Sequence, residues 1–142
     1  MAGAGDWERL ARLIEDDDAV AAAVRDAVEG GEDPWEALLD GLDEAGALAY
    51  LHADDTGMEL TDALAQLPRV FAAQPDLDEA TDTDDLPAAT RIADGVLAAD
   101  GLRVVRLVED DQSWPLVVLP EERVKDVLRA TAACGQEASL GG

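Results

Sequence analysis

The sequence predicts an α+β domain with six helices and a small three-stranded sheet, and two observations lead to this prediction. Apolar residues recur at helical spacing in several segments that glycine, proline and acidic residues separate. The runs Leu102–Glu109 and Trp114–Leu119 are rich in valine and leucine, as strands are. A chain of 142 residues has the size of one domain, so we expect a single domain over 1–142 with an ordered core over 6–135.

Three helices are predicted before the first strand. The first begins at Asp6, and the second follows an acidic break at Asp16–Asp18 that supplies its N-cap. The third has the clearest start, with Asp33 as N-cap and Pro34 in the first turn. The apolar positions that give these helices a buried face are Trp7, Leu10, Ile14, Val20, Val24, Ala27, Trp35, Leu38, Leu39 and Leu42. For the tryptophans we favour core packing over a role as exposed interface anchors.

A short strand and a fourth helix follow. Ala47–His52 is apolar and comes directly after a helix stop at Gly46, which predicts a strand. The fourth helix is capped by Asp55 or Thr56 and ends or bends at Pro68.

The segment Gln74–Leu86 is acidic and poor in apolar residues, so we expect a solvated loop. Its carboxylates do not have the spacing of a calcium loop, because Thr81 replaces the turn glycine and Pro87 the bidentate glutamate. They are instead candidates for contacting a basic partner: Asp76, Asp78, Glu79, Asp82, Asp84 and Asp85. A fifth helix then runs from Asp85 to Asp100.

The C-terminal part is predicted to be a hairpin and a sixth helix. A short polar loop, Asp110–Ser113, joins the two valine-rich strands, which are therefore antiparallel. The last helix opens at Pro120 and closes at Gly135, and we expect residues 1–5 and 136–142 to be loose. The order is α-α-α-β-α-α-β-β-α, with helices packed chiefly on one face of the sheet and an N-terminal helical layer. Whether the first strand runs parallel to the second is left open.

Charge is the strongest compositional feature. The net charge is -23, from 33 acidic and 10 basic residues, and such a field repels nucleic acid and anionic membranes while it attracts basic protein surfaces. A solubilising coat would have the same composition. The single cysteine, Cys134, excludes an intrachain disulfide. With neither a signal peptide nor an apolar run of about 20 residues, we expect a cytoplasmic protein without a membrane partner.

Motifs for catalysis or cofactor binding are missing from the sequence. The only lysine, Lys125, lies inside the last predicted helix rather than in a phosphate-binding loop, and Gly3-Ala-Gly5 does not complete a dinucleotide fingerprint. We therefore predict no catalytic residue and no cofactor.

One local cluster is a weak candidate for a divalent metal. His52, Asp54 and Asp55 follow the first strand, and carboxylates at strand ends suit hard cations. If the first two strands are parallel, Asp110 and Asp111 reach the same edge. The alternative is that these side chains cap a helix and a hairpin turn.

The stretch from Trp35-Glu-Ala-Leu-Leu to Leu42-Asp-Glu-Ala-Gly-Ala-Leu-Ala-Tyr-Leu, with the two strands that begin near Gly101 and Ser113, resembles a bacterial family known as domain of unknown function 6630. The resemblance covers Trp35 to Gly135 and implies a shared α+β fold. The family has no established activity, so the resemblance assigns no functional residues. At the end of the first strand, His52-Ala53 differs from the aromatic residue and lysine that the family often has.

These observations favour a non-enzymatic interaction protein that binds a basic protein partner, such as an immunity protein, antitoxin, inhibitor or adaptor. Two alternatives stay open. One is a small metal-dependent enzyme that uses the Asp cluster, and the other is a nucleic-acid mimic that occupies a DNA-binding protein.

Overall fold

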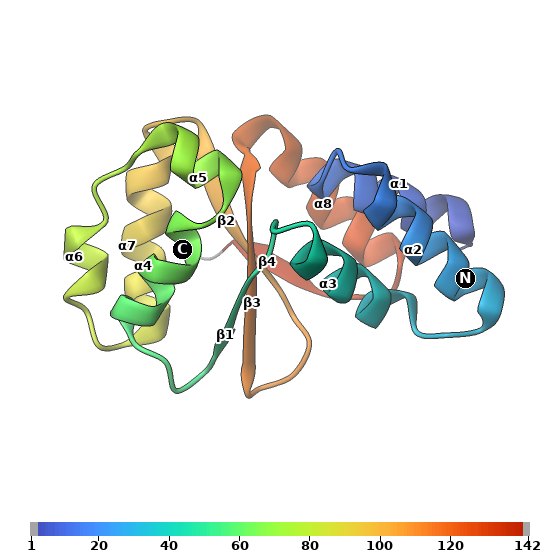
Figure 1. Cartoon of the computed structure of the whole chain (residues 1–142), viewed down its shortest axis with the longest axis horizontal. Coiled ribbons are helices and arrows are strands. Elements are labelled where there is room, and N and C mark those ends of the chain that lie inside the picture. The colour runs from blue at the N-terminus through green and yellow to red at the C-terminus, as the bar shows by residue number, and fades with distance from the viewer. Residues whose placement is uncertain (1–2, 141–142) are drawn as a thin grey trace.

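Figure 1 shows the computed structural model, which describes residues 3–140. Within this range the chain forms eight helices and four strands: α1 (Ala4–Ile14), α2 (Asp18–Gly30), α3 (Pro34–Glu44), β1 (Ala49–His52), α4 (Gly57–Ala65), α5 (Pro68–Ala73), α6 (Asp78–Thr81), α7 (Leu86–Ala98), β2 (Leu102–Leu107), β3 (Ser113–Pro120), α8 (Glu121–Ala133) and β4 (Ala138–Leu140). The α+β prediction is confirmed. None of the helices in the described range is both long and apolar enough to cross a bilayer.

Helices α2 and α3 begin where their capping residues predict. The carboxylate of Asp17 accepts a hydrogen bond from Ala19 N–H at the start of α2, and that of Asp33 accepts one from Trp35 N–H at the start of α3. Helix α1 begins at Ala4, so the loose start predicted for residues 1–5 is wrong from that residue onward; residues 1–2 lie outside the described range.

The sheet is antiparallel, with strand order β1-β3-β2-β4. Strands β2 and β3 form the predicted hairpin, with Val104 opposite Val118. Since β1 and β2 are both antiparallel to β3, they run in the same direction, which answers the question left open by the sequence. The pairing of β2 with β3 stops at Arg106–Leu116, so the missing N–H of Pro115 interrupts no hydrogen bond between these strands.

The number of strands is corrected from three to four. The sequence predicts loose residues over 136–142, yet β4 pairs with Val105–Leu107 on the outer edge of β2. Gly135 adopts a left-handed conformation, with φ of 74°, and so reverses the chain after α8 toward that edge. Residues 141–142 lie outside the described range.

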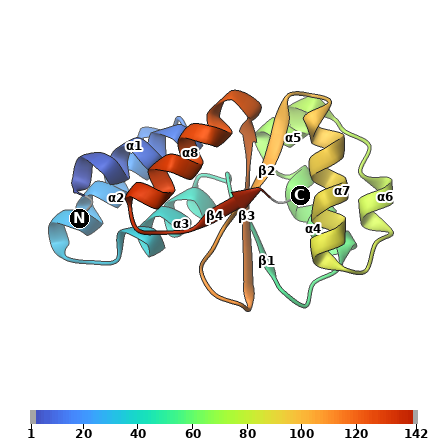
Figure 2. The same cartoon turned by 180° about the vertical axis from the view of Figure 1, so that it is seen from behind.

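Helices cover both faces of the sheet, which corrects the prediction of packing chiefly on one face (Figures 1 and 2). Val105 and Val117 belong to the core with α1, α2, α3 and α8, whereas Val104 and Val118 belong to the core with α4 to α7. Both central strands are apolar on both faces, and such strands require a helical layer on each side.

Two tryptophans confirm the predicted core packing. Trp7 and Trp35 are each 5% exposed, with ring centroids 6.3 Å apart. Trp114 is half-buried, donates a hydrogen bond to Thr90 Oγ1 at 3.2 Å and lies 3.9 Å beneath the Arg106 guanidinium.

The acidic segment after α4 is more ordered than a solvated loop. Pro68 starts the separate helix α5, and α6 forms within the predicted loop. Leu77 and Ala80 are buried between acidic neighbours and attach this segment to the core. Two well-spaced apolar residues therefore order a stretch whose average composition indicates a loop.

Candidate functional site

The side chains predicted near the end of β1 stabilise a turn. His52 N–H donates to Asp55 Oδ2 at 2.9 Å, and Asp54 N–H donates to His52 Nδ1 at 3.2 Å. Thr56 and Glu59 then form the capping box of α4. The side chains of His52 and Asp55 thus have local structural partners, whereas the Asp54 carboxylate is exposed, with Oδ2 3.5 Å from His52 Nδ1.

The loop between β2 and β3 is placed at the same end of the sheet. Asp110 Oδ1 accepts hydrogen bonds from Gln112 N–H and Ser113 N–H, both at 2.8 Å, and these bonds, the Gln112 contact foremost, lower the pKa of Asp110. Asp111 is exposed. Ala53 N–H donates to Gln112 O at 2.9 Å, which brings the two loops together. Nevertheless, no three His, Cys, Asp or Glu side chains between residues 3 and 140 gather closely enough to hold a metal ion.

The predicted partner-binding residues of the acidic segment are all exposed around α6. Two of the six also have structural partners, because Asp76 accepts a hydrogen bond from Asp78 N–H and Asp85 caps α7 through Ala88 N–H. The other four are Asp78, Glu79, Asp82 and Asp84.

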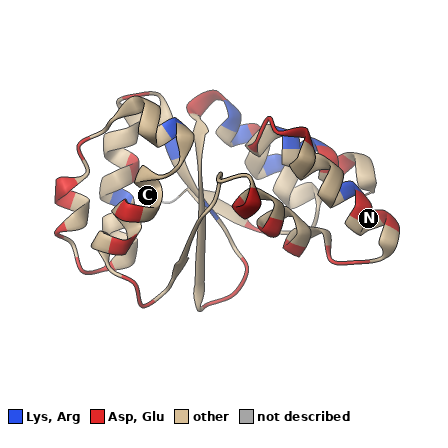
Figure 3. Ribbon diagram, in the orientation of Figure 1, with Lys and Arg blue, Asp and Glu red and all other residues tan. Residues whose placement is uncertain are grey.

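Acidic residues are widespread, but basic residues are confined to a few elements (Figure 3). No lysine or arginine occurs between Asp26 and Pro68, the stretch that contains α3, β1 and α4. Six of the ten basic residues lie on the layer of α1, α2 and α8: Arg9, Arg12, Arg25, Arg123, Lys125 and Arg129. Three of these form ion pairs there, with Asp18, Glu8 and Asp16. The carboxylates along α3, β1 and α4 therefore have no basic residue near them in the sequence, and the same holds for residues 70–90 around α6.

Two adjoining cavities lie on either side of β1 within this stretch. The larger, about 360 Å³, lies toward α3, and the smaller, about 240 Å³, lies toward α4. Both are lined by Asp43, Leu48 and Tyr50, and we call the adjoining pair the β1 groove. Its α3 side is lined by Glu36, Leu39, Asp40 and Glu109, and its α4 side by Gly46, Ala49, Ala63, Gln66 and Leu67.

Tyr50 lies at the centre of the β1 groove and is 50% exposed. Burial alternates along β1, with Ala49 and Leu51 in the core beneath α4 to α7 and Tyr50 on the opposite face. The Tyr50 hydroxyl donates to the Glu109 carboxylate, and this hydrogen bond raises the pKa of the phenol above its usual value. The phenol therefore stays neutral near pH 7 and contributes an amphipathic surface surrounded by carboxylates.

The outer edge of β1 is open only in part. The hydrogen bond from Ala53 N–H to Gln112 shows that odd-numbered residues of this strand face β3, because backbone groups alternate between the two edges of a strand. Tyr50 and His52 therefore direct N–H and C=O outward. The N–H of His52 donates to the Asp55 carboxylate, and the C=O of His52 accepts a hydrogen bond from the Asp55 N–H. The backbone N–H and C=O of Tyr50 have no hydrogen-bond partner among residues 3–140.

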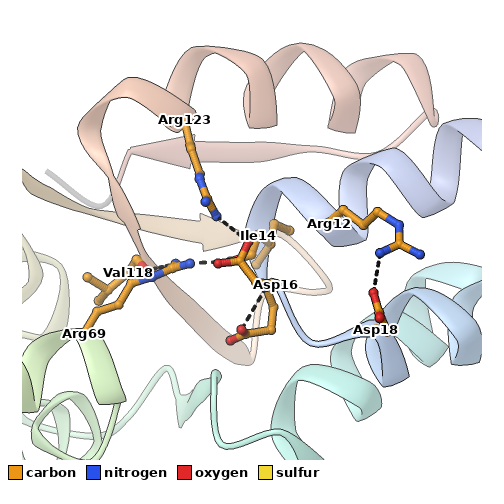
Figure 4. A network of polar contacts seen from close by, with 8 residues as sticks. Arg12, Ile14, Asp16, Asp18, Arg69, Val118 and Arg123 are labelled. Atoms are coloured by element: carbon orange, nitrogen blue, oxygen red, sulfur yellow. Dashed lines mark hydrogen bonds and ion pairs between the residues drawn. The ribbon is translucent and has the colours of Figure 1, made fainter.

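A third cavity, of about 210 Å³, is lined in part by Arg69, whose polar contacts are shown in Figure 4. Arg69 Nη1 donates to the backbone carbonyls of Ile14 at 3.1 Å and Val118 at 2.8 Å. Burial lowers the pKa of Arg69. Because the neighbouring loop carries Glu15 and Asp16, the cavity disfavours anions, and we assign Arg69 a structural role that joins α5 to α1 and β3.

Replacing Arg69 with methionine is expected to lower the free energy of unfolding by about 1 to 3 kcal/mol, because two backbone carbonyls lose their donor. Urea denaturation of both proteins measures this difference. Arg91, which is exposed on α7, provides the matched control, and Arg91→Met should change stability by no more than about 0.5 kcal/mol. Equal effects of the two substitutions would contradict the structural role of Arg69.

Comparison with known protein families identifies the domain. Residues 5–141 match the family described as a domain of unknown function, DUF6630. The chain belongs to this family. The match includes the N-terminal helices as well as the stretch from Trp35 to Gly135 that carries the resemblance in the sequence. No curated protein and no solved structure matches the chain.

The sequence alone did not predict the β1 groove of this DUF6630 domain. Tyr50 and Glu109 are 59 residues apart and meet only because β3 pairs with β1 and brings the β2–β3 loop with it. One signal was present in the sequence, namely the absence of lysine and arginine over a stretch that contains the only tyrosine. The close spacing of acidic residues around α6 instead predicted a partner-binding site in that segment.

Proposed function

We propose that this domain is a non-enzymatic binding protein whose β1 groove receives a basic segment of a partner protein. The observation that carries the proposal is the arrangement of four carboxylates around half-exposed Tyr50. Glu36, Asp40 and Asp43 come from the part of the chain without basic residues, and Glu109 comes from the β2–β3 loop. Opposite charge in a partner increases its association rate and its specificity. A tyrosine at the centre of the contact supplies apolar area, and the floor of Leu39 and Leu48 adds to it.

The shape of the groove favours this function over the two alternatives. A metal enzyme needs ligands that converge on one point, and no such group of three occurs in the described range, 3–140. A nucleic-acid mimic spaces its carboxylates like the phosphates along a duplex, which carries one negative charge per about 1.7 Å of helix axis. The carboxylates of the β1 groove instead line a hollow with an apolar floor, which suits the insertion of basic side chains.

Charge reversal tests where the attraction resides. The probe is a synthetic hexapeptide that contains arginine and valine. We expect the double variant Asp40→Lys, Asp43→Lys to bind this peptide about tenfold or more weakly, because close charge pairs contribute more than about 1.4 kcal/mol. The matched control is Asp82→Lys with Asp84→Lys, which changes the net charge equally at exposed positions near α6. It should weaken binding by less than about threefold.

Calorimetry at low and at physiological ionic strength measures both effects, and binding to the wild-type chain should weaken as salt is added. Equal losses in the two double variants would show that the overall charge, and not the β1 groove, attracts the peptide. In that case the proposed function of the groove is wrong.

A further inference from the structure

The outer edge of β1 offers a short open stretch for another strand. Tyr50 directs its N–H and C=O outward, and the same alternation places Leu48 in this orientation. Asp55 closes the edge at His52. Beyond the other end of β1, a longer strand would pair with the carbonyl of Val118 on β3. Arg69 already donates a hydrogen bond to that carbonyl. The open edge is therefore limited to the residues that line the β1 groove.

The two sides of the β1 groove differ in chemistry. An extended segment that pairs with β1 projects its side chains alternately over the α3 side and over the α4 side. On the α3 side they meet carboxylates, among them Asp40 and Glu109. On the α4 side they meet the neutral side chains of Ala63, Gln66 and Leu67. A segment that fits both sides alternates basic and small apolar residues.

A second copy of the chain does not meet these requirements. Pairing of two β1 edges would bring two rows of carboxylates together, in a molecule with a net charge of -23. An oppositely charged extended segment avoids this repulsion and satisfies the backbone groups of Tyr50.

We propose, on the basis of the binding function proposed above, that the partner segment adds to the outer edge of β1 as an extended strand, with basic side chains over α3 and small apolar side chains over α4. The Tyr50 N–H and C=O supply backbone hydrogen bonds, and the carboxylates of the α3 side select the basic residues.

Synthetic peptides test this geometry with the wild-type chain. The parent probe is an end-capped hexapeptide that alternates arginine and valine, and the control has three arginines followed by three valines. Two further probes carry backbone N-methyl groups, on every arginine in one and on every valine in the other. In a strand, alternate N–H groups face one edge, so only one of these two sets faces β1.

Calorimetry should show that the alternating peptide binds about tenfold more tightly than the block peptide. One N-methylated peptide should lose about tenfold or more in affinity, while the other stays within about threefold of the parent. The set that is tolerated also reveals the direction of the added strand. NMR-detected hydrogen exchange of the Tyr50 amide should slow when the parent peptide is bound.

Other outcomes separate the two proposals. Equal affinity of all four peptides, with a loss for all of them in the Asp40→Lys, Asp43→Lys variant, overturns strand addition and leaves the basic-partner function standing. Failure of every peptide to bind at low ionic strength overturns both. Slower hydrogen exchange throughout the chain, without a preference for Tyr50, also contradicts strand addition.

Discussion

Replacing Gly57 with alanine is expected to lower the free energy of unfolding by about 3 kcal/mol, because added atoms in a tightly packed site force the surroundings to move. Gly57 is the first residue of α4 and packs against the backbone of α6 and of the residues just after it. A Cβ at this position would lie 1.9 Å from Ala80 O and 2.4 Å from Thr83 O. Gly57 N–H also donates to Thr83 O at 2.9 Å, so relief of the clash lengthens this hydrogen bond.

Urea denaturation measures the loss, and Gly95 provides the matched control. Gly95 lies within α7, and a Cβ added there would meet nothing within 4 Å beyond its chain neighbours and the backbone of its own helix. Gly95→Ala should therefore stabilise the chain by about 0.5 to 1 kcal/mol through its higher helix propensity. If Gly57→Ala is as stable as the wild-type chain, α4 does not pack closely against the backbone of Ala80 and Thr83.

Replacing Asp94 with alanine is expected to cost about 3 kcal/mol. Removal of one partner from a buried ion pair costs about 3 to 5 kcal/mol, and the Arg103 side chain, which is 24% exposed, keeps some access to water. Asp94 is 4% exposed on α7 and accepts hydrogen bonds from Arg103 Nε at 3.0 Å and Arg103 Nη2 at 2.7 Å. It also accepts one from Val104 N–H at 2.9 Å. The substitution leaves a guanidinium and a buried N–H without their acceptor.

A double variant separates the pair from its surroundings. Asp94→Ala combined with Arg103→Met should recover part of the stability lost in Asp94→Ala alone, because the unpaired guanidinium is gone. Asp100→Ala, at an exposed position beyond α7, should change stability by no more than about 0.5 kcal/mol. Additive losses in the double variant would contradict the direct interaction between Asp94 and Arg103.

Segments with strong local signals were predicted correctly. The start of α3 follows from Asp33 and Pro34, which satisfy the first turn of a helix whatever it packs against. The β2–β3 hairpin follows from two apolar runs joined by a short polar loop. Such elements depend on neighbours in the chain, and a single sequence contains that information.

Elements with weak local signals were missed. Strand β4 has only three residues and gains its backbone partners from the free edge of β2. Helix α6 is ordered by the burial of Leu77 and Ala80 beneath its acidic residues. The apolar runs of β2 and β3 indicate burial on both faces of the sheet, which the expected packing of helices chiefly on one face left out of account.

By itself the sequence determined a folded, strongly acidic α+β domain, because capping residues, apolar periodicity and composition act over short distances along the chain. The lack of basic residues between Asp26 and Pro68 is visible in the sequence, but only the tertiary structure decided which carboxylates gather beside this stretch. Strand pairing brings Glu109 beside Tyr50, and α3 places Asp40 and Asp43 along the same groove. Contacts between residues far apart in the chain depend on the strand order β1-β3-β2-β4, and local patterns do not contain that order.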